Sequence, residues 1–204
     1  MTVLLVNGSP HEKGCTYTAL AEVEKQLKAN GIETDWFQLG SRPVRGCIAC
    51  RGCVSLGKCV FDDDGCNELA EKMSAADGIV IGSPVYYAGP NGALCALLDR
   101  AFYTKGKTFD GKLGAAVVSC RRGGASATFD RLNKYFTISN MPVVSSQYWN
   151  SIHGNTAEQA AQDLEGLQIM RTLGNNMAYL LKQKAAAGLD APEREARVST
   201  NYIR

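Results

Sequence analysis

The sequence predicts an α/β fold, a three-layer sandwich in which helices cover both faces of a five-stranded parallel sheet. Two observations carry this prediction. Short apolar runs of strand length alternate along the chain with segments whose apolar residues recur at helical spacing. The apolar runs lack a polar alternation, which is typical of strands buried on both faces. The length of 204 residues and the hydrophobic content of 45% suit one domain with a sizeable core.

The predicted elements follow one another in a regular order. Strands are expected at 2–7, 32–39, 78–82, 113–119 and 142–146. Helices are expected at 18–30, with Thr16 as the cap, and at 67–76, 90–103, 125–136 and 156–187, the last interrupted at Gly166 and Gly174. Residues 40–66 show no periodicity, and a loop this long is uncommon unless it is functional. We therefore expect a domain over residues 1–187 with a cysteine-rich loop at 40–66, followed by a polar C-terminal tail at 188–204.

Five strands with right-handed crossovers give the order 2-1-3-4-5, which is the flavodoxin-like order. In such sheets ligands bind beyond the carboxyl ends of the strands, where the strand order switches. This rule brings four loops to one rim, namely residues 9–16, 84–89, 119–124 and 147–154.

The first of these loops, from Gly8 to Thr16, is polar, glycine-bounded and followed by a helix. Unpaired backbone N–H groups and the helix dipole make such a place suitable for a phosphate. No Gly-Lys-Ser/Thr ends the loop and no Gly-x-Gly-x-x-Gly is present, so it is neither a Walker loop nor a dinucleotide fingerprint. The alternative is an ordinary strand-to-helix turn.

The next two loops suit a flat, oxygen-rich ligand. Tyr86 and Tyr87 offer aromatic surface, whereas Gly123 and Gly124 allow close backbone approach beside Arg121 and Arg122. Each loop alone also fits a plain structural role, as a closing turn or a solvated charge pair. Their convergence on one rim favours a binding site.

Cys47-x2-Cys50-x2-Cys53-x5-Cys59 is the most specific spacing in the chain. Four such thiolates can bind an iron–sulfur cluster, and they also fit structural zinc. A reduced, metal-free loop is the remaining alternative.

Charge and hydropathy exclude several classes of protein. The formal net charge of +2 gives no electrostatic basis for binding nucleic acid or a membrane surface. No apolar run approaches the roughly 20 residues of a membrane helix, and the N-terminus lacks a signal-peptide pattern. We expect a cytoplasmic protein, whose eight cysteines serve as thiols or ligands rather than as a disulfide framework.

Several motifs together resemble those of the NAD(P)H-dependent FMN reductases of the flavodoxin-like superfamily, which include the iron–sulfur flavoproteins. The motifs are Gly8-Ser9-Pro10 to Thr16, Gly82-Ser83-Pro84-Val85-Tyr86, Leu98-Asp99-Arg100, the turn from Arg121 to Gly124 and the cysteine loop. The resemblance implies that the FMN phosphate is held by Ser9, His11, Cys15, Thr16 and Tyr17. It implies that Pro84, Val85, Tyr86 and Tyr87 border the isoalloxazine ring, and that Ser119, Arg121, Arg122, Gly123 and Gly124 meet its pyrimidine edge.

The resemblance further implies an FMN-dependent oxidoreductase that uses NAD(P)H as co-substrate and reduces a small acceptor of the quinone, nitroaromatic or flavin type. No side chain is singled out as catalytic. A [4Fe–4S] cluster at Cys47, Cys50, Cys53 and Cys59 and assembly into a homodimer or homotetramer are also implied. Alternatives are an iron–sulfur flavoprotein or a flavodoxin-type carrier that delivers single electrons to a protein partner. Such carriers are usually strongly acidic, which this chain is not. A binding module without flavin is a third class.

Overall fold

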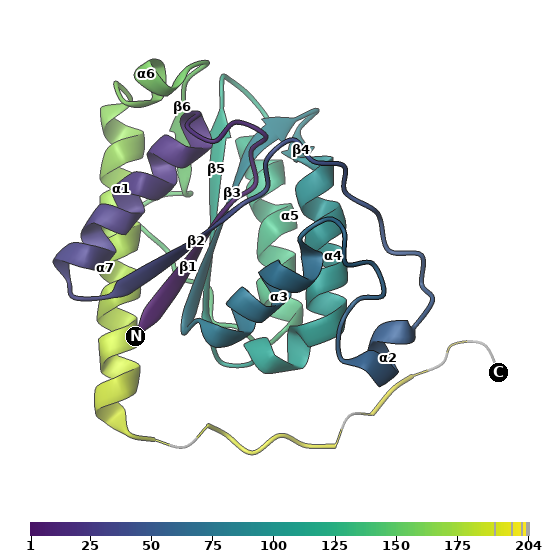
Figure 1. Cartoon of the computed structure of the whole chain (residues 1–204). Coiled ribbons are helices and arrows are strands. Elements are labelled where there is room, and N and C mark those ends of the chain that lie inside the picture. Colours follow the sequence, from purple (N-terminus) through teal and green to yellow (C-terminus); the bar gives the residue numbers. More distant parts are fainter. Residues whose placement is uncertain (190, 197, 201, 203–204) are drawn as a thin grey trace.

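A parallel sheet forms the middle of the molecule (Figure 1). The computed structural model describes residues 1–189, 191–196, 198–200 and 202. The strand order is β2-β1-β3-β5-β6, and the two-residue strand β4 pairs antiparallel with the end of β3. The strands are β1 (Thr2–Asn7), β2 (Glu33–Gln38), β3 (Gly78–Tyr86), β4 (Gly89–Pro90), β5 (Leu113–Cys120) and β6 (Ser151–His153). The predicted fold class and strand order are therefore confirmed, with β4 as an addition.

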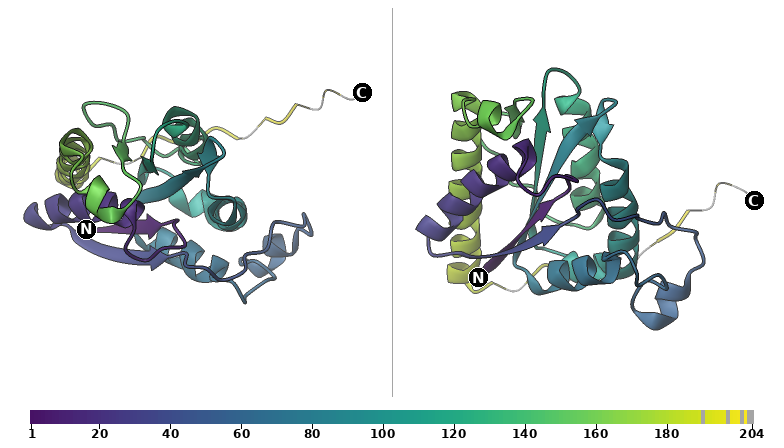
Figure 2. Two further views of the ribbon diagram at one scale, coloured as in Figure 1. Left: turned by 90° about the horizontal axis from the view of Figure 1, so that it is seen from above. Right: turned by 45° about the horizontal axis from the view of Figure 1, so that its top comes forward.

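Helices cover both faces of this sheet (Figure 2). One face packs against α3 (Cys66–Ala75), α4 (Gly92–Lys105) and α5 (Ala125–Ile138), and the opposite face against α1 (Cys15–Ala29) and α7 (Leu164–Ala187). Leu4 and Val6 of β1 point to the first layer, whereas Val3 and Leu5 point to the second. Because alternate side chains of β1 are buried in opposite layers, both sets are apolar and the strand appears in the sequence as a continuous apolar run. Short elements are α2 (Gly52–Leu56), α6 (Ala157–Ala160) and a 3₁₀ turn η1 (Gly106–Phe109).

The predicted fifth strand at 142–146 is wrong. Only one bridge, between Gly114 and Val143, forms there, and the regular edge strand is β6 (Ser151–His153). Between these two contacts the chain leaves the edge, and the buried Asn150 side chain donates to the carbonyl of Ala116 at 3.0 Å. The side-chain amide thus replaces a ladder hydrogen bond, which a pattern of apolar residues cannot reveal.

The predicted break points of the last helix are also wrong. The helical stretch divides at residues 161–163, where the carboxylate of Asp163 caps α7 by accepting from the Gly166 N–H at 2.9 Å. Gly166 and Gly174 lie inside α7. A Cβ on Gly174 would come within 2.8 Å of the Val23 carbonyl oxygen in α1, so this glycine permits close helix packing rather than ending a helix.

Three smaller differences affect the site. Gly14, not Thr16, is the residue before the first turn of α1, so the cap prediction is wrong. Strand β3 continues through residues that were predicted as loop and ends at Tyr86. The cysteine loop contains one short helix, α2.

The C-terminal segment has no regular secondary structure among its described residues, and Arg194 pairs with Asp110. Parts of the predicted tail, residues 190, 197, 201 and 203–204, lie outside the described residues. The division into a domain and a tail stays a prediction. Among the helices of the described residues, none combines the length and the hydropathy needed to cross a bilayer.

Candidate functional site

An open cleft of about 760 Å³ lies at the carboxyl ends of the parallel strands. It receives residues from the loops after β1, β5 and β6 and from the carboxyl ends of β3 and β5 themselves, as the rule for switch points predicts. Of the predicted FMN-binding residues, the cleft is lined by Ser9, His11, Cys15, Thr16, Pro84, Val85, Tyr86, Ser119 and Arg121. Tyr17, Tyr87, Arg122, Gly123 and Gly124 do not line it. The loops therefore converge, although not every side chain faces inward.

The loop after β1 is held by Asn7, a fully buried residue at the end of the strand. Its side-chain oxygen accepts from the Ser9 N–H at 3.2 Å, and its amide group donates to Gln38 at 2.6 Å and to the Glu12 carbonyl at 3.2 Å. Ser9 in turn accepts from the His11 N–H at 3.1 Å. These side chains fix the shape of the loop, and they occupy the backbone N–H groups of Ser9 and His11.

The first turn of α1 presents free donors to this cleft. Among the described residues, none accepts a hydrogen bond from the backbone N–H groups of Cys15, Thr16 or Tyr17; the first such bond is from Thr18 to the Gly14 carbonyl. These groups form the positive end of a helix of 15 residues. Such an arrangement can hold a phosphate without any cationic side chain.

Three of the predicted side chains, those of Thr16, Tyr17 and Ser119, have partners within the protein. The hydroxyl groups of Thr16 and Ser119, both buried, lie 2.8 Å apart and join the first loop to the end of β5. The ring of Tyr17 packs against Trp36 with 5.2 Å between centroids. The Thr16 and Tyr17 side chains therefore shape the site, and their backbone N–H groups remain available.

Two thiols line the cleft, those of Cys15 and Cys120. Burial raises the pKa of both. The thiols are therefore protonated at neutral pH, so neither is an activated nucleophile.

The turn between β3 and β4 has unusual backbone geometry. Tyr87 and Ala88 both have positive φ, 49° and 58°, and Tyr87 is fully exposed. Gly124, with φ of +91°, lies under this turn, and a Cβ there would meet Ala88 Cα at 2.8 Å. Positive φ at both central residues is what a two-residue hairpin turn of type I′ requires, and these two residues join the paired Tyr86 and Gly89. The Tyr87 side chain is exposed and does not line the cleft.

Two kinds of residue escaped the sequence reasoning. Asn91 caps α4, and its side chain donates to the Gly8 carbonyl at 2.8 Å, so it joins the start of α4 to the loop after β1. Asn7, at the end of β1, likewise binds the loop after β1 through its side chain. The signal for both is a buried polar residue next to a glycine loop. Asn155, Thr156 and Ala157 also line the cleft, and they were missed because the edge strand was misplaced.

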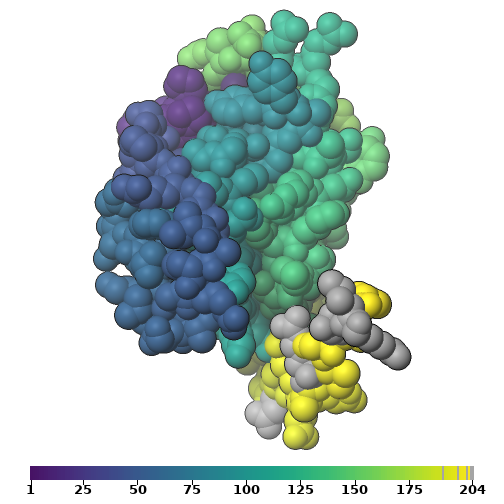
Figure 3. All heavy atoms as spheres, turned by 90° about the vertical axis from the view of Figure 1, so that its right-hand side faces the viewer, coloured from purple at the N-terminus to yellow at the C-terminus, as the bar shows by residue number. Residues whose placement is uncertain are grey.

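A second, smaller hollow lies in the cysteine loop, on the flank beside α4. Figure 3 shows this blue segment on the surface next to the teal of α4. Cys47, Cys50, Cys53 and Cys59 all line the hollow, together with Phe61 and Arg100. It shares no lining residue with the cleft, so the cysteine loop does not cover the cleft.

The four thiols are free, and the hollow encloses only about 20 Å³. Within the described part of the chain, no group of three or more His, Cys, Asp or Glu side chains is arranged to hold a single metal ion. The donor set of four thiols at one hollow suits a cluster, in which each iron takes one thiolate and the sulfurs stand farther apart than around one ion. Cys47 and Cys50 are exposed, whereas Cys53 and Cys59 are partly buried.

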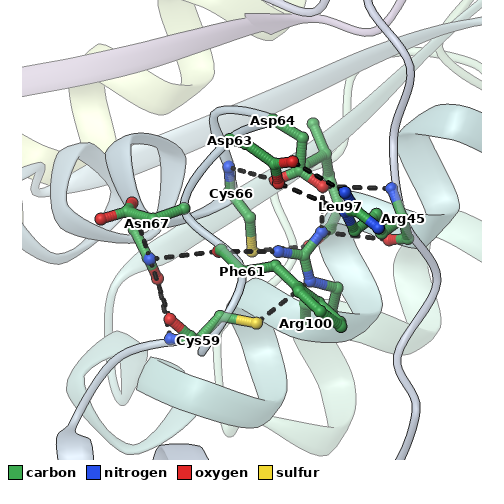
Figure 4. Close-up of polar contacts among 10 residues, drawn as sticks. Arg45, Cys59, Phe61, Asp63, Asp64, Cys66, Asn67, Leu97 and Arg100 are labelled. Atoms are coloured by element: carbon green, nitrogen blue, oxygen red, sulfur yellow. Dashed lines mark hydrogen bonds and ion pairs between the residues drawn. The ribbon is translucent and has the colours of Figure 1, made fainter.

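Arg100 of α4 lies under the loop and is 2% exposed (Figure 4). Its guanidinium group pairs with the buried Asp64 and donates to the carbonyls of Arg45 at 3.0 Å and Phe61 at 3.1 Å. Its Nε–H donates to Sγ of Cys59 at 3.2 Å. Burial alone would raise the pKa of Asp64, but the hydrogen bonds from Arg100 and the Arg45 N–H outweigh it and the pKa is lowered.

Comparison with known proteins identifies the family. A model of the NADPH-dependent FMN reductase family matches residues 1–156. The chain belongs to this family. An iron–sulfur flavoprotein of Methanocaldococcus jannaschii is 34% identical over 190 residues, covering 89% of this chain and 98% of that protein. An iron–sulfur flavoprotein of Methanosarcina thermophila is 32% identical over 187 residues, covering 89% and 96%. The resemblance read from the motifs is thus confirmed.

Solved structures with a similar fold are more distant from this chain in sequence than the two iron–sulfur flavoproteins. RosB, crystallised with 8-demethyl-8-formylriboflavin-5′-phosphate, superposes with a TM-score of 0.73 at 15% identity, covering 100% of this chain and 94% of RosB. An archaeal flavodoxin gives a TM-score of 0.62 at 14% identity, covering 89% and 99%. At these identities the likeness establishes the flavodoxin-like fold alone.

Proposed function

We propose that this protein is an FMN-dependent NAD(P)H oxidoreductase that reduces a small acceptor of the quinone, nitroaromatic or flavin type. The observation that carries the proposal is the first turn of α1: Cys15 and Thr16 line a cleft of about 760 Å³, and no described residue accepts from their backbone N–H groups. Membership of the NADPH-dependent FMN reductase family supports it. We also propose that the protein is cytoplasmic.

The residues would act by binding and orientation. The N–H groups of Cys15, Thr16 and Tyr17 would hold the phosphate, with Ser9 and His11 beside it. Pro84, Val85 and Tyr86 would border the flavin ring, with the exposed Tyr87 next in the chain. Backbone N–H groups near Gly123 and Gly124, helped by Arg121 or Arg122, would favour negative charge on the pyrimidine edge. Bound FMN would supply the redox chemistry, which requires no protein nucleophile.

The cysteine loop would hold a [4Fe–4S] cluster through Cys47, Cys50, Cys53 and Cys59. Two observations support this part of the proposal: the four thiols line one hollow, and the relatives of highest identity given above are iron–sulfur flavoproteins. With a cluster, delivery of single electrons to a protein partner is the alternative outlet. We also propose a homodimer or homotetramer.

Steady-state oxidation of NADH and NADPH by the FMN-loaded protein tests the proposed activity, with a panel of quinone, nitroaromatic and flavin acceptors. Acceptor-dependent consumption of a reduced nicotinamide is expected. A protein that binds FMN yet consumes neither nucleotide with any acceptor would instead be a single-electron carrier. Rates measured with and without an oxidised ferredoxin-type protein as electron acceptor separate the two outlets.

A further inference from the structure

The cysteine loop is anchored to the domain at one cysteine more firmly than at the others. Cys47 and Cys50 are exposed, whereas Cys59 is partly buried. The backbone N–H of Cys59 donates to Asn67 Oδ1 at 2.8 Å, and the Asn67 amide donates to the Cys59 carbonyl at 3.0 Å. Cys59 therefore has a fixed backbone, and Figure 4 shows its sulfur pointing to Arg100.

Arg100 gathers both ends of the loop around that sulfur. One of its N–H groups binds the carbonyl of Arg45, which precedes the first cysteine of the run, and another binds the carbonyl of Phe61, which follows the last. Asp64 is its carboxylate partner, and that residue also accepts from the Arg45 N–H at 3.1 Å. The guanidinium group lies 5.5 Å from the Phe61 ring centroid. The two terminal nitrogen atoms of the guanidinium group make these polar contacts, and Nε–H donates to Sγ of Cys59.

A purely structural tie would not need the Nε contact. The pair with Asp64 and the two carbonyls already hold the loop ends, yet a fourth hydrogen bond, from Nε–H, is directed at a ligand sulfur. Hydrogen bonds to the cysteine sulfurs and nearby charge are the means by which proteins tune the reduction potentials of iron–sulfur clusters. A donor on the sulfur and a buried positive charge both favour the more negative, reduced cluster.

We propose that Arg100 is a positioning residue for the proposed cluster. It fixes Sγ of Cys59 in place before the cluster binds, so that the other three thiols bind the cluster around this first ligand, and it raises the cluster's reduction potential. This inference rests on the cluster of the proposed function. It assigns a role to a residue of α4 that is not itself a ligand.

The test compares the cluster potential of Arg100→Lys with that of the wild-type protein after anaerobic reconstitution with iron and sulfide. Lysine keeps the positive charge but lacks the planar fork that reaches four partners at once. We expect the equilibrium constant for one-electron reduction to fall at least tenfold, which is about 59 mV, and the iron content to fall by at least half. The potential is followed by electron paramagnetic resonance during a redox titration.

Two control variants separate positioning from general loosening of the loop. Asn67→Ala removes the backbone anchor of Cys59 but not the bond to its sulfur, so any cluster that forms should keep the wild-type potential within threefold. Arg45→Lys changes an exposed side chain that pairs with Asp63, and it should keep both iron content and potential. FMN content reports folding in every variant.

If Arg100→Lys loses FMN and so does not fold, the neutral pair Arg100→Gln/Asp64→Asn takes its place, because it leaves no unpaired buried charge. A wild-type potential and iron content in the folded variant would overturn the inference. An equal shift of potential in Asn67→Ala would also overturn it. If the wild-type protein itself takes up no iron, the cluster part of the proposed function fails and the inference fails with it, whereas FMN binding is unaffected.

Discussion

At the scale of single residues, the site is shaped by polar side chains that bind the protein itself. Thr16 and Ser119, both predicted as ligand contacts, line the cleft, and their hydroxyl groups also bind each other. The residue types and their loop could be read from the sequence. The direction of each side chain could not, because it depends on partners about 100 positions away along the chain.

Gly124 and Gly123 make a matched pair for a test at this scale. Gly124→Ala forces a side chain into left-handed backbone and against Ala88 Cα at 2.8 Å, so we expect a loss of about 2 kcal/mol in the free energy of unfolding. Gly123 has open space around it and no positive φ. Gly123→Ala should leave stability unchanged or raise it by up to about 1 kcal/mol. Urea unfolding measures both, and equal stabilities would contradict the packing under the β3–β4 turn.

At the scale of elements, long segments with a periodic apolar pattern were predicted well. Places where a polar side chain takes over a backbone hydrogen bond of the sheet were not. The strands at the centre of the sheet are apolar because both faces are covered, so their pattern is strong. The edge strand was misplaced because Asn150 replaces part of the ladder. The last helix was divided at its glycines, but Gly174 packs against α1, and Gly166 lies against the capping carboxylate of Asp163. Composition alone does not distinguish a glycine that breaks a helix from one that admits a neighbour.

Gly174 provides the test of that contact. In an exposed helix, Gly→Ala would gain about 1 kcal/mol from helix propensity. Here the new Cβ would lie 2.7 Å from Gln26 Cβ and 2.8 Å from the Val23 carbonyl oxygen, and overpacking of this kind costs about 1–3 kcal/mol. We expect Gly174→Ala to be destabilised in thermal unfolding. Gly92→Ala, in the first turn of α4 with open space around it, should not be destabilised.

The anchor of the cysteine loop should be sensitive to acid. The pKa of Asp64 is lowered in the folded protein, so its contribution to stability is fully present above the unfolded value of about 3.9 and is lost as the pH falls through the lower folded value. We expect the free energy of unfolding of the wild-type protein to decrease when the pH is lowered below about 4. Asp64→Asn should cost about 3 kcal/mol at pH 7, because Arg100 is left buried without a carboxylate, and it should flatten that acid dependence.

Asp63→Asn serves as the control for this prediction. Its carboxylate is exposed and pairs with Arg45 at the surface, so stability at pH 7 should hardly change. An acid profile of Asp64→Asn that matches the wild-type profile would assign the acid sensitivity to other carboxylates.

At the scale of the whole molecule, apolar side chains gather around the cysteine loop. Ile48, Val54, Leu56, Val60 and Tyr103 are all substantially exposed there. Such a patch favours a protein partner, and it supports the proposed homodimer or homotetramer. Sedimentation equilibrium at micromolar concentration should give a multiple of 21.9 kDa. A single monomer mass across that range would contradict the assembly.

The central claim is that the cleft at the carboxyl ends of the strands holds FMN. The most direct test is to extract the nucleotide from the purified protein, identify it by mass and determine its amount per chain. We expect FMN at about one molecule per chain, because the free first turn of α1 offers one phosphate site and the chain has no dinucleotide fingerprint. Recovery of FAD, or of no flavin even after reconstitution with FMN, would contradict the account.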